Sequence, residues 1–252
     1  MNPITVIPAR MASTRLPGKP LAEIAGRPML LHVLDRAREA AIGPVLVAVA
    51  EPELVRIVEA EGGLAVLTDP ALPSGSDRVH AALASYDPEG RFDVVVNLQG
   101  DLPQMPAADL RAVLAALADP AIDLATLAAE IHAEDEAAAA SVVKIACAFA
   151  EGEATTRALY FSRQPIPWGA GPLWHHIGVY AWRRAALARF VACPESLLER
   201  REKLEQLRAL EAGMRIAVAR VAAAPFGVDT EADLVRARAW FARRPTPAGA
   251  PA

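Results

Sequence analysis

The sequence lacks several features that would assign it to common classes of protein. It contains only two cysteines, Cys147 and Cys193, and they form neither a metal-binding nor a redox spacing. We expect two buried, unreactive thiols in a reducing compartment. An excess of basic residues is also missing, because 26 Lys and Arg stand against 30 Asp and Glu, a formal net charge of −4. This balance argues against binding to nucleic acid or to a membrane surface, which usually needs a broad basic field.

Signals for export or membrane insertion are missing as well. The first residues, MNPITVIPAR, contain no charged region followed by a long apolar stretch, so we expect no signal peptide. No apolar run approaches the roughly 20 residues that a membrane-spanning helix needs. The sequence therefore predicts a cytoplasmic protein.

What the chain does have is a regular alternation of apolar strands and amphipathic helices. Hydrophobic residues make up 53% of its 252 residues, which is enough for a large core. In the first half we predict strands at 4–9, 45–50, 64–67 and 93–98, and helices at 28–41, 52–62, 78–86 and 107–117. Strands and helices that alternate across short loops favour an α/β fold with an open, mostly parallel sheet.

The alternation changes after Asp119. We predict further strands at 124–131, 142–149, 157–161, 177–182 and 216–222, and helices at 196–212 and 231–241. Residues 1–243 are predicted to form one domain with a smaller inserted lobe at about 124–195, which could bind a second substrate or form an oligomer contact. The Pro- and Ala-rich residues 244–252 are predicted to be a flexible tail.

A cationic loop follows the first predicted strand, within the run IPARMASTRLPGKPL. In open α/β sheets, ligands bind beyond the carboxyl ends of the strands, where this loop lies. The loop matches neither G-x-G-x-x-G nor G-x-x-x-x-G-K-[ST], because Gly18 is its only glycine and Pro20 follows Lys19. Its polar residues are Arg10, Ser13, Thr14, Arg15 and Lys19. Guanidinium and ammonium groups bind phosphate oxygens well, so the loop indicates a triphosphate site, with a solvated cationic loop as the alternative.

Two aspartates are candidate metal ligands. Asp101 follows a predicted strand in the run VNLQGD, although an Asp after Gly can also simply form a turn. Asp229 stands in GVDT before the last predicted helix, where it could instead be a helix N-terminal signal. Mg²⁺ prefers oxygen ligands and is usually held by only one or two carboxylates. The residues alone leave the ligand and cap readings of Asp229 both open.

Taken together, these stretches resemble the CMP-sugar synthetases, in the branch that activates 3-deoxy-manno-octulosonate (Kdo). Seven stretches occur in the order of that family: IPARMASTRLPGKPL, SGSDR, VNLQGD, YFSR, HHIGVY, EKLEQLR and GVDT. The resemblance implies an open, mostly parallel, Rossmann-like (GT-A-like) nucleotidyltransferase sheet. It also implies transfer of CMP from CTP to the 2-hydroxyl of Kdo, release of pyrophosphate, a requirement for Mg²⁺, a homodimer, and a role in lipopolysaccharide synthesis.

The resemblance also implies a role for individual residues. Arg10 and Lys19 would be catalytic together with Asp101 and Asp229, and these two aspartates would hold the metal. The implied nucleotide-binding residues are Ala9, Arg10, Ser13, Arg15, Lys19, Ser74, Gly75, Arg78, Gln99 and Asp101. The implied sugar-acid-binding residues are Arg78, Gln99, Arg163, His176, Tyr180, Glu205 and Gln206.

Several of these residues also have a simpler structural explanation. SGSDR alone is a turn and a helix cap, and the run around Glu205 alone is a charged helix face. His175 and His176 are adjacent in a predicted strand, so at most one of them should face a pocket. Arg163 ends a strand and could bind the acid or pair with an Asp of the lobe.

The chain departs from the commoner family pattern at a few positions. Leu102 follows QGD where many members carry Glu, and Ser76-Asp77 replaces the frequent Thr-Glu. A leucine cannot bind metal, so a carboxylate function at position 102 is lost. These departures bear on the choice of acceptor more than on the reaction. The alternatives are 8-amino-Kdo or another sugar acid as acceptor, and a nucleotide-binding protein without catalytic activity.

Overall fold

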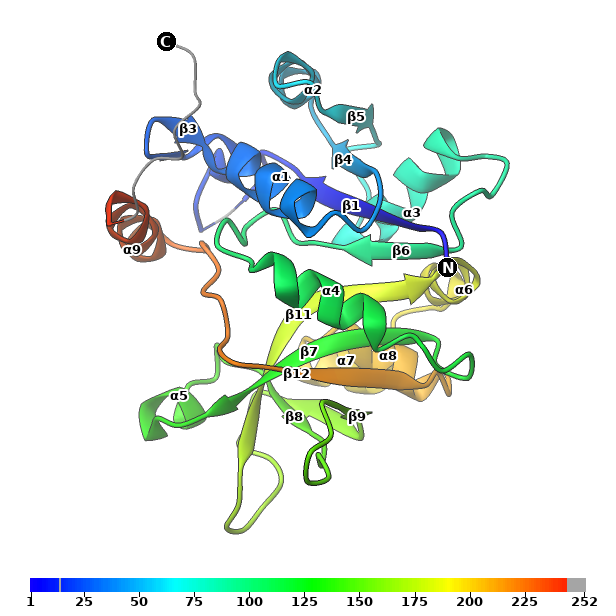
Figure 1. Ribbon diagram of the computed structural model, residues 1–252, viewed down its shortest axis with the longest axis vertical. Helices are drawn as coiled ribbons and strands as arrows, with labels where there is room; N and C mark the ends of the chain where they lie inside the picture. The colour runs from blue at the N-terminus through cyan, green and yellow to red at the C-terminus, as the bar shows by residue number, and fades with distance from the viewer. Residues whose placement is uncertain (14, 244–252) are drawn as a thin grey trace.

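A ten-stranded sheet forms the centre of the structure, a computed structural model that describes residues 1–13 and 15–243 (Figure 1). Thr14 and the predicted tail at 244–252 lie outside the described residues. Along the sheet, the strands follow one another in the order β5 (Leu64–Leu67), β4 (Val45–Val49), β1 (Pro3–Ala9), β6 (Val94–Asn97), β11 (Leu173–Arg183), β7 (Leu124–Ile131), β12 (Ile216–Val221) and β9 (Thr155–Arg157). The short strands β8 (Lys144–Ala146) and β10 (Tyr160–Ser162) pair with each other, and β8 also pairs with β11.

The sheet is mostly parallel, as the sequence predicts. β1 runs parallel to β4 and β6, β4 runs parallel to β5, and β12 runs parallel to β7. β11 is antiparallel to both β6 and β7, so it is the one reversed strand between β5 and β12 in the described chain. Because β1 and β6 are parallel neighbours, the loops that leave them begin at the same edge of the sheet.

Helices cover both faces of the sheet. The first face carries α1 (Met29–Ala40), α2 (Pro52–Ala60) and α4 (Ala107–Ala115), and the second carries α3 (Gly75–Tyr86), α6 (Arg184–Ala192), α7 (Leu197–Glu202) and α8 (Gln206–Glu211). Along β1, Ile7 packs on the first face whereas Ile4 and Val6 pack on the second. A strand covered on both faces needs apolar residues at nearly every position, which explains the continuous apolar runs of the sequence.

The segment predicted to be a lobe extends the sheet. β7 and β11 belong to the main sheet, whereas β8, β9, β10 and α5 (Glu134–Ala138) lie at its far end (Figure 1). The strand predicted at 142–149 is shorter than expected, and the one predicted at 157–161 is replaced by β9 and β10 on either side of Ala158. β11 begins four residues before the predicted strand and contains a register shift between Ile177 and Ala181.

The single helix predicted at 196–212 is wrong, because the chain breaks it into α7 and α8. Lys203 ends α7 in a left-handed conformation, with φ 58°. Arg163 donates hydrogen bonds to the backbone carbonyls of Glu202 and Lys203 (2.9 and 3.2 Å). Carbonyls at a helix end need partners, and here a side chain from a distant segment supplies them, so α7 can stop.

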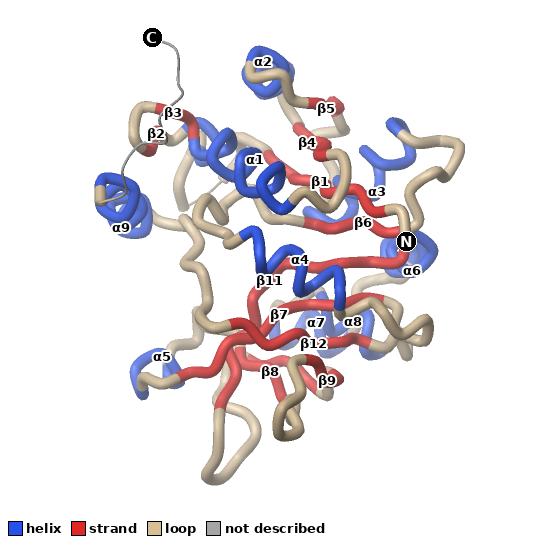
Figure 2. The backbone as a smooth tube through the Cα atoms, in the orientation of Figure 1, coloured by secondary structure: helices blue, strands red, loops and turns tan. Residues whose placement is uncertain are grey.

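A separate small core lies beneath the first loop. Leu16 of that loop packs there with the buried residues Ile24, Met29, Val228, Leu234 and Ala237. Leu234 and Ala237 belong to α9 (Glu231–Ala242), which lies beside the hairpin of β2 (Glu23–Ile24) and β3 (Arg27–Pro28). Figure 2 shows the loop that carries the chain from β12 across to α9. The C-terminal helix therefore supports the N-terminal loop.

The two cysteines are free; Cys147 is buried and Cys193 is partly exposed. Among the described residues, no helix is both long enough and apolar enough to cross a membrane.

The small core beneath the loop generates a stability prediction. Leu234 is 3% exposed, whereas its neighbour Val235 is 57% exposed. Leu234→Ala should lower the free energy of unfolding by about 2–4 kcal/mol, because it leaves a cavity under the loop. Val235→Ala, the matched control, should change it by no more than about 0.5 kcal/mol. Urea unfolding measures both values, and equal losses in the two variants would show that α9 is not anchored in this core.

Candidate active site

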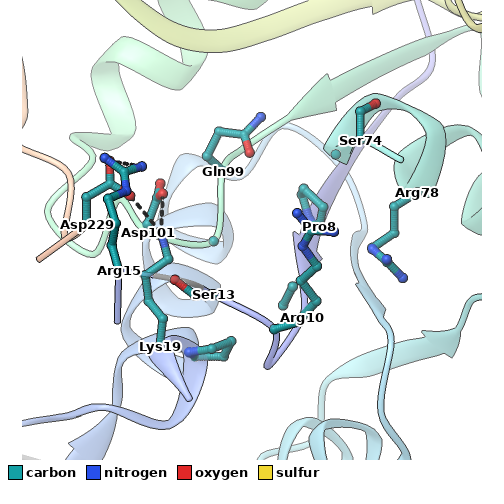
Figure 3. A pocket seen from close by; sticks show the side chains of 15 residues that line it. Pro8, Arg10, Ser13, Arg15, Lys19, Ser74, Arg78, Gln99, Asp101 and Asp229 are labelled. Atoms are coloured by element: carbon teal, nitrogen blue, oxygen red, sulfur yellow. Dashed lines mark hydrogen bonds and ion pairs between the residues drawn. The ribbon is translucent and has the colours of Figure 1, made fainter. Parts of the chain in front are cut away.

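A cavity of about 360 Å³ opens at the carboxyl ends of β1 and β6 (Figure 3). Four segments line it: the end of β1 with the first loop, the start of α3, the turn after β6, and Asp229 before α9. This is the edge of an open α/β sheet at which ligands bind. The cavity therefore lies where the sequence places the nucleotide.

All ten residues predicted to bind the nucleotide line this cavity. Those residues are Ala9, Arg10, Ser13, Arg15, Lys19, Ser74, Gly75, Arg78, Gln99 and Asp101. Four further lining residues were not singled out from the sequence, namely Pro8, Ala12, Pro20 and Gly100. None of these four has a polar side chain that could have marked it in the sequence. Gly100 has a backbone role, because a Cβ atom there would come within 2.7 Å of the Pro8 carbonyl oxygen, so the turn after β6 can pass close to β1 only as glycine.

An ion-paired group occupies one side of the cavity. Lys19 Nζ lies 2.8 Å from Asp101 Oδ2 and 3.0 Å from Asp229 Oδ1. Arg15 Nη2 lies 3.0 Å from Asp229 Oδ2. Burial alone would lower the pKa of Lys19, but the two carboxylates outweigh it and raise that pKa above its usual value. The first loop, the turn after β6 and the segment before α9 therefore meet at one ammonium group.

Asp229 is free to face the cavity because a neighbouring residue caps the helix. Thr230 is the N-cap of α9: its hydroxyl accepts from the backbone N–H of Asp233, and the Asp233 carboxylate accepts from the backbone N–H of Thr230. This is a capping box, so the cap alternative for the Asp229 side chain is wrong. The backbone N–H of Val228 donates to the Asp101 carbonyl oxygen at 2.9 Å, which places the two aspartates side by side.

Leu102, the departure from the commoner family pattern, is a buried packing residue. It belongs to the main core, and its Cδ2 lies 3.8 Å from the point where a Cβ on Gly227 would stand. The backbone of Gly227 continues directly into Val228 and Asp229. Leu102 thus lies against the segment that carries Asp229, and its apolar side chain cannot act as a metal ligand.

Arg78 stands on the opposite side of the cavity (Figure 3). It is 2% exposed, and its Nη1 donates to the Thr68 hydroxyl and, at 3.2 Å, to the Asp69 carbonyl oxygen. Within the described chain, its buried Nη2 has no hydrogen-bond partner. Burial, together with the nearby Arg10, lowers the pKa of Arg78. The guanidinium is therefore fixed in the wall of the cavity, with one buried nitrogen that bonds to no described residue.

The residues predicted to bind the sugar acid divide between two places. Arg78 and Gln99 line the cavity, whereas the other five lie outside its lining. Those five are Arg163, His176, Tyr180, Glu205 and Gln206. Glu205 is nevertheless linked to the cavity, because Ser76 Oγ donates to Glu205 Oε2 at 3.0 Å and Ser76 follows the lining residue Gly75 on α3. Burial raises the pKa of Glu205, against hydrogen bonds from Ser74 and Ser76 that lower it.

The two adjacent histidines face opposite sides of β11, as the sequence predicts. His176 is buried; its Nε2 lies 3.0 Å from Thr126 Oγ1, and its ring meets those of Phe161 and Tyr180. Burial, with a smaller effect of His175, lowers the pKa of His176 to about 3, so the ring is neutral at physiological pH. His175 instead pairs with Glu136 of α5 at 2.7 Å.

Tyr180 and Arg163 contact other parts of the protein and do not line the cavity. Tyr180 is buried and lies opposite Asn97 in the pairing of β11 with β6, and burial raises the pKa of its hydroxyl. The Arg163 guanidinium donates to the backbone carbonyls of Ala140, Glu202 and Lys203. In the described residues it forms no ion pair with an Asp, so that alternative is not realised.

The sheet and its cationic cavity define the chain as a nucleotidyltransferase. Residues 4–216 match the family described as Cytidylyltransferase. The chain belongs to this family and, within it, to the 3-deoxy-manno-octulosonate cytidylyltransferases. Relatives of that name are 63% identical in Rhodospirillum centenum, over 94% of this chain and 93% of the relative, and 59% identical in Parvibaculum lavamentivorans, over 96% and 94%.

Solved structures agree with this assignment. A CMP:2-keto-3-deoxy-manno-octonic acid synthetase in complex with CTP superimposes with a TM-score of 0.87 at 40% identity, over 96% of this chain and 99% of the other. A 4-diphosphocytidyl-2C-methyl-D-erythritol synthase from Anaerococcus prevotii gives a TM-score of 0.63 at 12% identity, over 96% and 99%. The second likeness concerns the fold alone.

The buried, neutral His176 generates a pH prediction. Its pKa is lowered on folding, so the unfolded chain binds a proton that the folded chain does not as the pH falls from about 6.5 towards 3. The stability that depends on the neutral ring is therefore complete above about pH 6.5 and declines below it. The contribution of His176 to the free energy of unfolding should fall by up to about 1.4 kcal/mol for each pH unit.

Unfolding by urea at pH 7, 6 and 5 measures this slope. His176→Gln should be less stable than wild type at pH 7. Its free energy of unfolding should also fall less steeply with decreasing pH, by the contribution of about one proton. His175→Gln, the same change at the neighbouring position, should leave the slope in place. An unchanged slope in His176→Gln would show that its ring is not buried in the neutral form.

Proposed function

We propose that the protein transfers CMP from CTP to the 2-hydroxyl of Kdo, forming CMP-Kdo and pyrophosphate, with Mg²⁺ as its cofactor. The observation that carries the proposal is the meeting of Arg10, Arg15 and Lys19 with Asp101 and Asp229 in one cavity at the ends of β1 and β6. The names of the similar proteins support CTP and Kdo as substrates. The product would serve lipopolysaccharide synthesis, and we assign the reaction to the cytoplasm, where the nucleoside triphosphate pool lies.

Asp101 and Asp229 fit a magnesium ion by their chemistry. Both offer hard carboxylate oxygens, and two carboxylates are a usual protein contribution to a Mg²⁺ site. Both already hold one cation between them, the Lys19 ammonium. When bound, Mg²⁺ would neutralise charge on phosphate oxygens and lower the pKa of the attacking hydroxyl.

The chain's own residues position the nucleotide for in-line attack on its α-phosphorus. Arg10, Arg15 and Lys19 bind the β- and γ-phosphates and neutralise the pyrophosphate as it leaves. Ser74, Gly75 and Gln99 border the rest of the nucleotide in the same cavity. Such transfers need little covalent chemistry from the protein, so orientation and charge neutralisation account for most of the catalysis.

The acceptor would lie between the cavity and the buried residues of β11 and α8. The Arg78 guanidinium, in the wall of the cavity, would attract the carboxylate of a sugar acid, and Gln99 can donate to a hydroxyl. Glu205 joins this group through Ser76, and Gln206 follows it at the start of α8. Burial and, to a smaller extent, Glu205 raise the pKa of Tyr180, whose ring meets that of His176. Arg163 is the most distant candidate by its contacts, because it donates to the carbonyls of Glu202 and Lys203. A neutral His176 can exchange hydrogen bonds with a hydroxyl but cannot pair with a carboxylate as a cation.

Pyrophosphate release tests the proposal and the metal ligands together. With CTP, Kdo and Mg²⁺, wild type should release pyrophosphate, and without Kdo it should not; 8-amino-Kdo in place of Kdo compares the two acceptors. Asp101→Asn and Asp229→Asn should each lower kcat on the order of 100-fold while remaining folded, because each weakens the stabilisation of transition-state charge. Asp135→Asn, at an exposed position on α5, is the matched control.

Two results would contradict the proposal. The first is an absence of Kdo-dependent pyrophosphate release from CTP by the folded wild-type protein. The second is near-normal turnover of Asp229→Asn at limiting Mg²⁺, which would remove Asp229 from the metal site.

A homodimer is part of the proposal, formed through the segment 124–195. This segment exposes two large apolar side chains, Trp168 at 100% and Leu159 at 68%. Large apolar side chains of this kind often mark an interface. Sedimentation should show a dimer for wild type and a shift to monomer for Trp168→Glu. Arg201→Glu, an exposed change outside the segment, should remain dimeric, and a monomeric wild type would contradict the dimer.

A further inference from the structure

The Lys19 ammonium stands between the two carboxylates that would hold the metal. Asp101 Oδ2 and Asp229 Oδ1 both lie within hydrogen-bond distance of this one nitrogen, and Arg15 pairs with Asp229 Oδ2. Three of the four carboxylate oxygens therefore contact a cation, counted within the described residues. Two anions face two cations, so this corner of the cavity carries no net charge that would attract a free divalent ion.

The backbone of the first loop fixes the position of Lys19, whereas its side chain can move the ammonium away from the two carboxylates. Gly18 precedes it with φ 70°, a left-handed conformation that suits glycine, and Leu16 fixes the base of the loop in the small core. The Lys19 side chain is 18% exposed and lines the same cavity as Arg10 and Ser13. Its flexible four-carbon stem allows the ammonium to turn from the carboxylates to another anion in the cavity.

We propose that Lys19 keeps the Asp101–Asp229 pair closed to free divalent metal ions until a nucleoside triphosphate draws its ammonium away. The metal then binds together with the triphosphate and not before it. This inference rests on the proposed function, because it takes these two aspartates as the metal ligands.

Electrostatic competition accounts for the order of binding. An ammonium and a metal ion cannot occupy the same place between two carboxylates. The charged oxygens of a triphosphate compete for Lys19 and leave the carboxylates with a negative charge that needs a cation. Binding of the triphosphate and of the metal is therefore positively coupled, and the coupling must be equal in both directions.

The test is a titration of the full-length protein with Mn²⁺ alone, followed by electron paramagnetic resonance of the free ion. Wild type should bind Mn²⁺ weakly without nucleotide. Lys19→Met, which keeps the stem and removes the charge, should bind it at least about tenfold more tightly. Lys19→Arg keeps the cation and should bind like wild type. Lys203→Met is the matched control, because Lys203 lies exposed at the end of α7.

Thermal unfolding gives a second readout and reports whether each variant is folded. Mg²⁺ alone should raise the Tm of Lys19→Met more than that of wild type, since a ligand stabilises the state that binds it. Equal Mn²⁺ affinity of wild type and Lys19→Met without nucleotide would overturn the inference.

A third titration separates this inference from the proposed function. With CTP present, wild type should bind Mn²⁺ more tightly than without it, and Asp101→Asn should abolish the gain. If that gain is seen while Lys19→Met alone binds no better than wild type, the inference fails and the metal site stands. If CTP produces no Asp101-dependent gain, the proposed metal site itself fails, and the inference fails with it.

Discussion

The contact of one ammonium group with two carboxylates organises the whole site. Lys19 is 82 positions from Asp101 and 210 positions from Asp229 along the chain, yet its Nζ contacts both. Backbone contacts fix the positions of the two aspartates. The Val228 N–H donates to the Asp101 carbonyl oxygen, and Gly100 allows the turn after β6 to pass close to β1. Like charges repel, so the Lys19 ammonium reduces the repulsion between the two aspartates, and Asp229 in turn reduces the repulsion between Lys19 and Arg15.

The sheet makes that contact possible. Parallel neighbours β1 and β6 end at the same edge, so the loop and the QGD turn begin side by side, and helices pack on both faces of the two strands. Helix α3 links the cavity to Glu205. Ser74 and Gly75 line the cavity, and Ser76 contacts Glu205. A site supported by strands and helix ends in this way is preorganised, which is what a reaction dominated by positioning requires.

Local signals explain which features the sequence could predict. The apolar runs of β4 and β6 and the cationic loop depend on neighbouring residues alone, so the parallel sheet and the edge that carries the cavity follow from them. The break between α7 and α8 could not be predicted, because Arg163, some 40 positions away, supplies the partners for the end of α7. The position of Asp229 stayed open for a similar reason. Only the structure shows that Thr230 is the cap.

The most direct test of this account is a double-mutant cycle between Lys19→Met and Asp229→Asn, measured as the free energy of unfolding without nucleotide or divalent metal. Groups in direct contact have interaction energies that distant groups lack. Because Asp229 is partly exposed, we expect a coupling of about 0.5–1 kcal/mol. Effects that add to within about 0.3 kcal/mol would contradict the account, since they would mean that Lys19 does not join the two aspartates in the folded protein.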